Sequence, residues 1–144
     1  MKKVMFLCTG NSCRSQMAEG FAREYGKGII EAHSAGLTPA GVNPRAIAVM
    51  KEIGIDISSQ RSKAIDEKIL KQMDVIVTLC GHAEAMCPMT PPEIERIHMP
   101  VDDPVSAIGT EEEITKGFRR ARDEIQERIA SLINDLKTEG KQHG

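Results

Sequence analysis

The feature that most constrains the fold is an eight-residue loop between a buried strand and an amphipathic helix. The apolar residues of 2–8 predict a strand, and apolar residues at helical spacing in 15–25 predict a helix. Residues 8–15 read Cys-Thr-Gly-Asn-Ser-Cys-Arg-Ser. In open α/β sheets the carboxyl ends of parallel strands share one edge, and ligands bind there. The loop is therefore the first candidate for a binding site.

The rest of the chain repeats the alternation of strands and helices. Further strands are predicted over 29–34, 75–79 and 93–99, and helices between Asn43 and Gly54, around 66–72 and from Thr110 onward. Strands that alternate with helices form a mainly parallel sheet covered on both faces. We therefore expect one α/β domain over residues 1–144, with three layers and a four-stranded parallel sheet.

Composition narrows the class of protein. The chain has 144 residues and a formal net charge of −2, and the absence of a basic block argues against nucleic acid as a partner. No apolar run reaches the length of a membrane span or of a secretory signal, so we expect a soluble, cytoplasmic protein without a membrane partner. Four cysteines in such a chain are more often reduced and catalytic than a disulfide framework.

The loop has the chemistry of a pocket for a tetrahedral oxyanion with a sulfur nucleophile. Loop N–H groups and a helix N-terminus attract an anion, Gly10 allows the required backbone angles, and Arg14 offers a planar fork. An ordinary thiol is only about 3% thiolate at pH 7, so full ionisation of Cys8 is worth about 2 kcal/mol. A helix dipole contributes about 0.3–1 kcal/mol, so Arg14, the loop N–H groups and the Ser15 hydroxyl must add to it. The predicted oxyanion loop comprises Thr9, Gly10, Asn11, Ser12, Cys13, Arg14 and Ser15.

Two alternatives accompany this loop. Cys8 could be a buried structural cysteine beside an ordinary helix start. Cys13 could be a second redox thiol, although we expect a packed loop residue.

A second pair of cysteines, Cys80 and Cys87, follows the strand at 75–79. If this strand pairs with the first, the strand ends lie about 4.8 Å apart, which suits a disulfide between Cys8 and Cys80. Cys80 and Cys87 would lie about 10 Å apart on a helix, so they could bond only if the segment unwinds. One alternative is a metal site that uses Cys80, His82 and Cys87 with a thiolate from the first loop, although the spacing matches no strong zinc pattern. Another is a pair of unreactive core thiols. His82 is most simply a surface residue.

Polar residues elsewhere on the same sheet edge are candidates for supporting roles. Asp102, Asp103 and Pro104 follow the last strand, where Asp103 could protonate a leaving oxygen, although Asp-Asp-Pro is also a common turn. Glu19, Ser34 and Lys63 lie in or after the elements that flank the pocket. Alone, each would be interpreted as a solvated or capping residue.

Taken together, these segments resemble thioredoxin-coupled arsenate reductases, which share the fold of low-molecular-weight protein tyrosine phosphatases. The similar stretches are the loop at 8–20, Ser-Ala-Gly at 34–36 with Gly-Val-Asn-Pro at 41–44, the segment 78–88, and Asp-Asp-Pro at 102–104. The Cys-x5-Arg loop alone is shared with the phosphatases. Its combination with Cys80 and Cys87 is specific to the reductases.

The resemblance implies a mechanism and a partner. Cys8 attacks arsenate held by the loop and Arg14, and Asp103 assists the loss of water. Cys80 attacks the adduct, releases arsenite and forms a transient Cys8–Cys80 disulfide. Cys87 then forms a Cys80–Cys87 disulfide, which reduced thioredoxin opens. No bound cofactor or metal is implied, and we expect a monomer that serves arsenic detoxification.

One position departs from the pattern of some relatives. Their potassium site would map to Asn11, Glu19, Ser34 and position 63, which is Lys63 here. An ammonium group could replace the cation, so we expect no obligatory potassium.

Three other functions remain open at this stage. A phosphatase of the same fold would need Cys8, Arg14 and Asp103 but neither Cys80 nor Cys87. Val105 and Ser106 stand where phosphatases specific for phosphotyrosine usually carry aromatic residues, so this substrate is not expected. A weak phosphatase activity is compatible with the sequence. A flavin mononucleotide carrier would lack aromatic side chains for stacking, since the chain has no Trp and one Tyr. An arsenite or metal sensor would retain a metal after purification.

Overall fold

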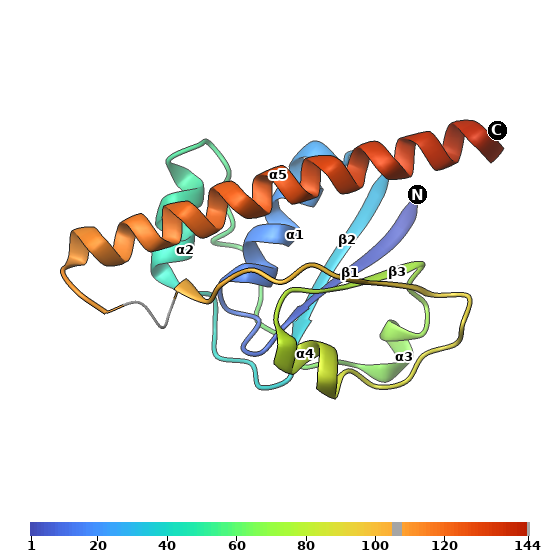
Figure 1. Ribbon diagram of the computed structural model, residues 1–144, viewed down its shortest axis with the longest axis horizontal. Coiled ribbons are helices and arrows are strands. Elements are labelled where there is room, and N and C mark those ends of the chain that lie inside the picture. Colours follow the sequence, from blue (N-terminus) through green and yellow to red (C-terminus); the bar gives the residue numbers. More distant parts are fainter. Residues whose placement is uncertain (105–107, 144) are drawn as a thin grey trace.

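The structure is a computed structural model that describes residues 1–104 and 108–143, without the side chains from 139 onward. Figure 1 shows how the helices and strands of the described residues are arranged. In order these are β1 (Lys2–Cys8), α1 (Arg14–Tyr25), β2 (Ile30–Gly36), α2 (Pro44–Lys51), α3 (Glu67–Leu70), β3 (Val75–Thr78), α4 (Gly81–Met86), β4 (Glu95–His98) and α5 (Glu111–His143).

The four strands form one parallel sheet in the order β2-β1-β3-β4. The predicted fold class, with a four-stranded parallel sheet, is therefore confirmed, and β1 pairs with β3, the condition on which the approach of Cys8 to Cys80 depends. Cys8 lies opposite Gly36 of β2, and Leu7 lies opposite Thr78 of β3. The oxyanion loop thus begins at the carboxyl end of a central strand, between the ends of its two neighbours.

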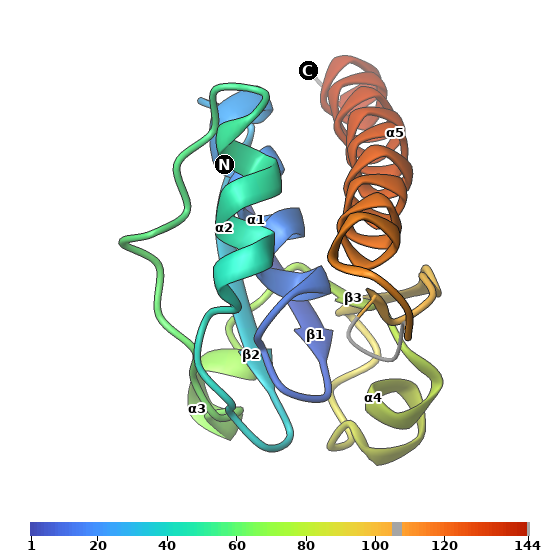
Figure 2. The same ribbon diagram turned by 90° about the vertical axis from the view of Figure 1, so that its left-hand side faces the viewer.

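Helices cover the two faces of the sheet unequally. α1 lies against β1 and β2, and both α1 and α2 pack against the long α5, whereas α4 contacts β1 and β3. Figures 1 and 2 both place α5 in the upper part of the molecule and α3 and α4 at the lower end. Three fully buried phenylalanines, Phe6, Phe21 and Phe118, come from β1, α1 and α5 and join these elements in one core.

Local signals explain most of the element ends. The Asn43 side chain caps α2 by accepting a hydrogen bond from the Arg45 N–H group (2.8 Å), and Gly54 ends that turn with φ of +81°. At α5, the Glu113 N–H group donates to the hydroxyl of Thr110 (3.1 Å), as the predicted capping box requires.

Some predicted boundaries were wrong by one or two residues. β2 extends past Ser34 to Gly36, because Ala35 and Gly36 still pair with Leu7 and Cys8 of β1. β3 ends at Thr78 rather than at 79, and α3 and β4 are shorter than predicted.

Candidate active site

Hydrogen bonds from a neighbouring segment occupy several carbonyl groups of the loop from Cys8 to Ser15. Three carbonyls accept hydrogen bonds from segment 38–43: Thr9 from Thr38 (2.8 Å), Gly10 from Ala40 (2.9 Å) and Ser12 from Asn43 (3.0 Å). In a trans peptide the N–H group points opposite to the C=O group. The N–H groups that follow these carbonyls are therefore directed to the other side of the loop, where they suit an anion.

A chain of hydrogen bonds ends on the sulfur of Cys8. The Lys63 N–H group donates to the Asn11 side-chain oxygen (2.8 Å), which orients the amide so that its NH₂ group donates to the Ser15 hydroxyl (2.8 Å). The Ser15 hydroxyl lies 2.8 Å from Cys8 Sγ. Because its oxygen already accepts from Asn11, its proton is free to point at the sulfur. The arrangement suits a thiolate on Cys8.

Asn11 and Gly36 show how closely the loop is fitted. Asn11 is fully buried with φ of +46°, a left-handed conformation that asparagine tolerates better than most residues. A Cβ atom at Gly36 would lie 2.6 Å from the Asn11 nitrogen and 2.8 Å from the Thr9 oxygen. The end of β2 therefore has to be glycine for the loop to lie against it.

Arg14 and Asp103 complete the hollow. The Arg14 guanidinium donates to the carbonyl of Val101 (3.0 Å), and its other terminal nitrogen lies 3.7 Å from Asp103 Oδ2. The hollow has a volume of about 350 Å³ and is lined by Cys8, Thr9, Gly10, Ser12, Cys13, Arg14, Ala40, Asn43 and Asp103. The structure thus brings the predicted nucleophile, guanidinium and acid to one pocket, which is large enough for a tetrahedral oxyanion.

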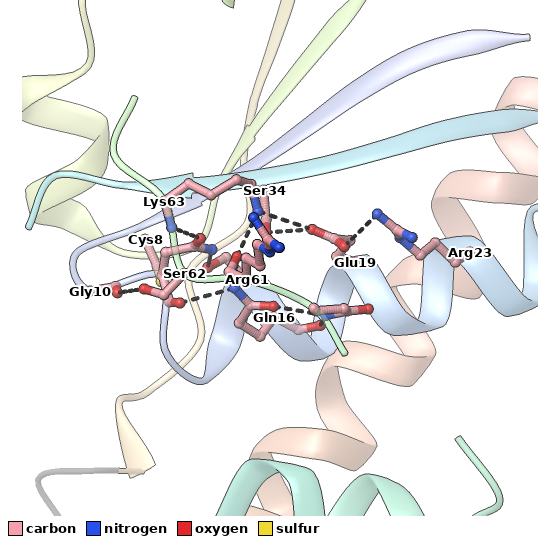
Figure 3. A network of polar contacts seen from close by, with 12 residues as sticks. Cys8, Gly10, Gln16, Glu19, Arg23, Ser34, Arg61, Ser62 and Lys63 are labelled. Atoms are coloured by element: carbon pink, nitrogen blue, oxygen red, sulfur yellow. Dashed lines mark hydrogen bonds and ion pairs between the residues drawn. The ribbon is translucent and has the colours of Figure 1, made fainter. Parts of the chain in front are cut away.

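Residues 61–63 lie beside the oxyanion loop and contact it, as Figure 3 shows. The Ser62 hydroxyl donates to the Gly10 carbonyl (3.0 Å), and the Gln16 amide donates to the carbonyls of Asn11 (3.1 Å) and Arg61 (2.9 Å). The sequence did not single out Gln16 or Ser62. The contacts of Gln16 with Arg61 and of Ser62 with Gly10 join residues 45 and 52 positions apart, which no local pattern records.

Glu19 is the buried carboxylate of this network. It is 1% exposed, and it accepts a hydrogen bond from the Ser34 hydroxyl (2.5 Å). Lys63 Nζ lies 3.8 Å away, as the sequence led us to expect, but Arg23 makes the closer ion pair at 2.9 Å and was missed. Partial burial lowers the pKa of Lys63, which Glu19 opposes. The three predicted supporting residues, Glu19, Ser34 and Lys63, thus meet in one cluster.

The second cysteine pair lies at the two ends of α4. Cys80 is the N-cap of α4, and its sulfur accepts a hydrogen bond from the Ala83 N–H group (3.3 Å). The same sulfur lies 3.4 Å from the Thr9 hydroxyl, so Cys80 adjoins the oxyanion loop. Cys87 follows the last residue of α4, and all four cysteines are free thiols. Formation of a Cys80–Cys87 disulfide from this structure requires α4 to unwind.

The remaining thiols differ in their surroundings. Burial, followed by the charges of Asp103 and Cys8, raises the pKa of Cys13 to about 12. Cys13 is also only 3% exposed, so its burial and its raised pKa both favour the packed loop residue that the sequence predicted. Burial also raises the pKa of the half-buried Cys87, while Arg96 opposes this shift.

Further observations concern other features that the sequence brought up. His82 is exposed, as expected. Among the side chains that the structure describes, no group of three or more His, Cys, Asp and Glu residues is arranged to hold a metal ion. Within the described part of the chain, no helix is long and apolar enough to cross a membrane. Val105 and Ser106 lie outside the described residues.

Comparison with known proteins agrees with this geometry. A family model described as low molecular weight phosphotyrosine protein phosphatase matches residues 3–142. The chain belongs to this family. It is 56% identical over 136 residues, 94% of this chain and 98% of the relative, to an arsenate reductase of Halalkalibacterium halodurans.

Solved structures of the family include both chemistries. The chain is similar to an arsenate reductase in the phosphate binding state, with a TM-score of 0.77, 41% identity and coverage of 94% of this chain and 99% of that one. It is also similar to a low molecular weight protein tyrosine phosphatase from T. tengcongensis, with a TM-score of 0.79, 28% identity and coverage of 94% and 99%. The resemblance stated from the sequence is confirmed.

Proposed function

We propose that the protein reduces arsenate to arsenite through Cys8, Cys80 and Cys87, and that reduced thioredoxin regenerates it. The observation that carries the proposal is the contact between the Thr9 hydroxyl and Cys80 Sγ (3.4 Å). This contact puts a second sulfur beside the loop that holds the nucleophile. Phosphate ester hydrolysis does not require a second thiol, whereas a reductase needs one so that two cysteines together supply the two electrons that reduce arsenate. Relatives named arsenate reductases, at 56% identity, support the choice of oxyanion.

The first step forms a bond between Cys8 and arsenic. Arsenate enters the pocket, where the loop N–H groups and the Arg14 fork hold its oxygens. The Cys8 thiolate attacks arsenic, and one oxygen leaves as water after Asp103 supplies a proton. Arsenic remains pentavalent in the adduct. Ser15 stabilises the attacking thiolate through the 2.8 Å contact.

The second step reduces arsenic and oxidises two cysteines. Cys80 loses its proton to solvent and attacks the sulfur of Cys8. The electron pair of the sulfur–arsenic bond passes to arsenic, which leaves as arsenite, and a Cys8–Cys80 disulfide remains. Cys87 then loses its proton and attacks Cys80, so that a Cys80–Cys87 disulfide forms and Cys8 leaves as a thiolate.

The final step needs an external dithiol. A reduced thioredoxin transfers two electrons to the Cys80–Cys87 disulfide and becomes oxidised itself. Thioredoxin can approach the end of α4 that carries Cys87, since the neighbouring residues Met86 and Met89 are 60% and 89% exposed. We propose that the protein works in the cytoplasm, where thiols stay reduced, and as a monomer, because one chain supplies every cysteine.

Loop support is assigned to Glu19, Ser34 and Lys63. The Lys63 ammonium lies between the Glu19 carboxylate (3.8 Å) and the Arg61 carbonyl (2.7 Å), where a bound cation would find oxygen ligands. We propose that this ammonium replaces a potassium ion.

The test follows NADPH oxidation with arsenate, thioredoxin and thioredoxin reductase. Wild type should turn over, and Cys8→Ser, Cys80→Ser and Cys87→Ser should each fall to the background rate. Cys13→Ser is the matched control and should turn over like wild type. Turnover of the Cys80 and Cys87 variants at the wild-type rate would contradict the relay.

A weak phosphatase activity is a second candidate, favoured by the shared pocket of Cys8, Arg14 and Asp103. Hydrolysis of p-nitrophenyl phosphate should need these three residues and survive Cys80→Ser and Cys87→Ser. Equal loss in all five variants would show that α4 is required to form the pocket, and would contradict this assignment.

A further inference from the structure

The helix α4 is tied to the sheet by a hydrogen-bonded relay to which no role has so far been assigned. The Thr78 hydroxyl, at the end of β3, lies 2.5 Å from Glu84 Oε2 on α4 and 2.9 Å from His98 Nδ1 on β4. His98 Nδ1 lies 3.9 Å from Glu84 Oε2. The three residues come from three elements and meet at one point.

The direction of the relay follows from the number of protons. An ionised carboxylate can only accept, so the single proton of the Thr78 hydroxyl goes to Glu84. The Thr78 oxygen is then an acceptor, and the His98 ring carries its proton on Nδ1. The relay therefore runs from His98 through Thr78 to Glu84, with both donors on the sheet and the acceptor on the helix.

Among the described residues, the other contacts of α4 include its packing against β1 and β3 and the N-cap bond to Cys80. The helix has six residues, and Ala83 is its only buried side chain. Arg96, which is also on β4, donates to the Pro88 carbonyl beyond Cys87 (3.3 Å) and makes a second tie. A helix this short is unstable on its own, so its winding depends on these contacts with the sheet.

Resting on the proposed function, we infer that Glu84, Thr78 and His98 are positioning residues that keep α4 wound and so set the rate at which Cys87 reaches Cys80. In that step the Cys87 thiolate attacks Cys80, the Cys80–Cys87 bond forms, and the Cys8–Cys80 bond breaks with Cys8 leaving as a thiolate. For the sulfurs to meet, the bonds from the Glu84 N–H group to the Cys80 carbonyl (3.1 Å) and from the Cys87 N–H group to the Ala83 carbonyl (2.9 Å) have to open. Glu84 must leave Thr78 in the same movement.

We call the hydrogen bonds that join Glu84, Thr78 and His98 the tether of α4. Two substitutions should loosen the hold on α4 and a third should make the helix more stable. Thr78→Val and Glu84→Gln weaken the relay with little change of shape. Gly81→Ala strengthens the helix itself, because alanine favours helix over glycine and a Cβ atom there would meet nothing within 4 Å. Glu95→Gln, on the exposed part of β4, is the control for the loss of one negative charge.

The first measurement is amide hydrogen exchange in the reduced protein, which needs no turnover. The Glu84 and Cys87 amides should exchange about two- to tenfold faster in Thr78→Val and Glu84→Gln, the range expected from loss of one hydrogen bond. They should exchange slower in Gly81→Ala and at the wild-type rate in Glu95→Gln. Unchanged exchange in the two relay variants overturns the tether.

The second measurement is a single turnover with arsenate and no thioredoxin, quenched in acid and read by mass spectrometry. The Cys80–Cys87 disulfide should replace the Cys8–Cys80 disulfide about two- to tenfold faster in the relay variants, and slower in Gly81→Ala. Formation of the Cys8–Cys80 disulfide should keep its wild-type rate, which a general loss of structure would not allow. If the Cys80–Cys87 disulfide forms at the wild-type rate or more slowly in Thr78→Val and Glu84→Gln, the inference is overturned. If wild type forms neither disulfide, the proposed relay of cysteines fails instead, while the exchange measurement still tests the tether.

Discussion

The hydroxyl of Ser15 lies 2.8 Å from the sulfur of Cys8, and it accepts a hydrogen bond from the Asn11 amide at the same time. A thiolate on Cys8 can only accept a hydrogen bond, so in that state the hydroxyl directs its proton to the sulfur. Since the buried Asn11 is held by the Lys63 N–H group, the hydroxyl has a fixed direction before any substrate binds. Such fixed donors stabilise charge without reorganising during the reaction.

Replacing Ser15 by alanine should lower kcat/KM for arsenate by about tenfold or more, since a hydrogen bond to a charged group is worth about 1.5–3 kcal/mol. Steady-state kinetics with thioredoxin and its reductase would measure the loss. Cys13→Ala, another buried residue of the loop, should stay within about twofold of wild type. Equal effects of the two substitutions would mean that the loop responds to packing alone.

Cys13 should resist alkylation in the native protein. Its pKa is raised to about 12 by burial and by nearby negative charge, so the thiol is neutral at pH 8. Mass spectrometry after treatment with iodoacetamide should find Cys8 modified and Cys13 intact, and both modified after unfolding. Rapid modification of native Cys13 would contradict the neutral packed state.

Glu52 should contribute to stability above about pH 4.5 and lose that contribution in acid. Hydrogen bonds from Arg119, and further ones from Arg122, lower the pKa of its carboxyl from 4.5 to about 2. A carboxyl whose pKa is lower when folded binds protons more tightly in the unfolded chain. The free energy of unfolding therefore falls as the pH drops from about 4.5 to about 2.

Urea unfolding between pH 2 and pH 7 tests this contribution. Glu52→Gln should be less stable than wild type at pH 7 and approach it near pH 2. Glu24→Gln, an exposed residue at the end of α1, should follow the wild-type curve. If the difference in free energy of unfolding between Glu52→Gln and wild type stays constant across this range, the ion pairs of Glu52 are not its cause.

Gly36→Ala should damage the loop. The added Cβ atom would lie 2.6 Å from the Asn11 nitrogen, which is backbone and cannot move aside without displacing the loop. We expect a loss of about 1–3 kcal/mol of stability and of most p-nitrophenyl phosphate hydrolysis. In Gly81→Ala the Cβ atom is unobstructed, so that variant should keep this activity. Full activity in Gly36→Ala would refute the fitted loop.

Potassium should not be required for activity. The Lys63 ammonium already lies 3.8 Å from Glu19 and 2.7 Å from the Arg61 carbonyl. Arsenate turnover should stay constant when potassium chloride replaces choline chloride at equal ionic strength. A rise of several-fold with potassium would contradict the role given to Lys63.

Whereas the pairing of β1 with β3 came from the structure, the sequence was sufficient for the order of elements, the parallel sheet and a candidate site at the carboxyl ends of its strands. These features depend on apolar periodicity and on the geometry of parallel sheets, which a single chain records locally. The oxyanion loop could be recognised because the chemistry of anion binding and thiolate attack explains why glycine, arginine and cysteine occur together at that spacing.

The supports of the site could not be predicted in the same way. The bond from Lys63 to Asn11 joins residues 52 positions apart, and the relay from His98 to Glu84 involves three separate elements. Arg23 was missed because an arginine at a helix end is ordinary, and only the fold places it 2.9 Å from the buried Glu19. Tertiary contacts of this kind decide how the loop and α4 are held.

The most direct test of the central claim is disulfide mapping by mass spectrometry after one turnover with arsenate in the absence of thioredoxin. Wild type should yield one arsenite per chain, a Cys80–Cys87 disulfide and a free Cys8, whereas Cys87→Ser should stop at a Cys8–Cys80 disulfide. Arsenite formed while all four cysteines of wild type remain free to alkylate would contradict the relay of three cysteines.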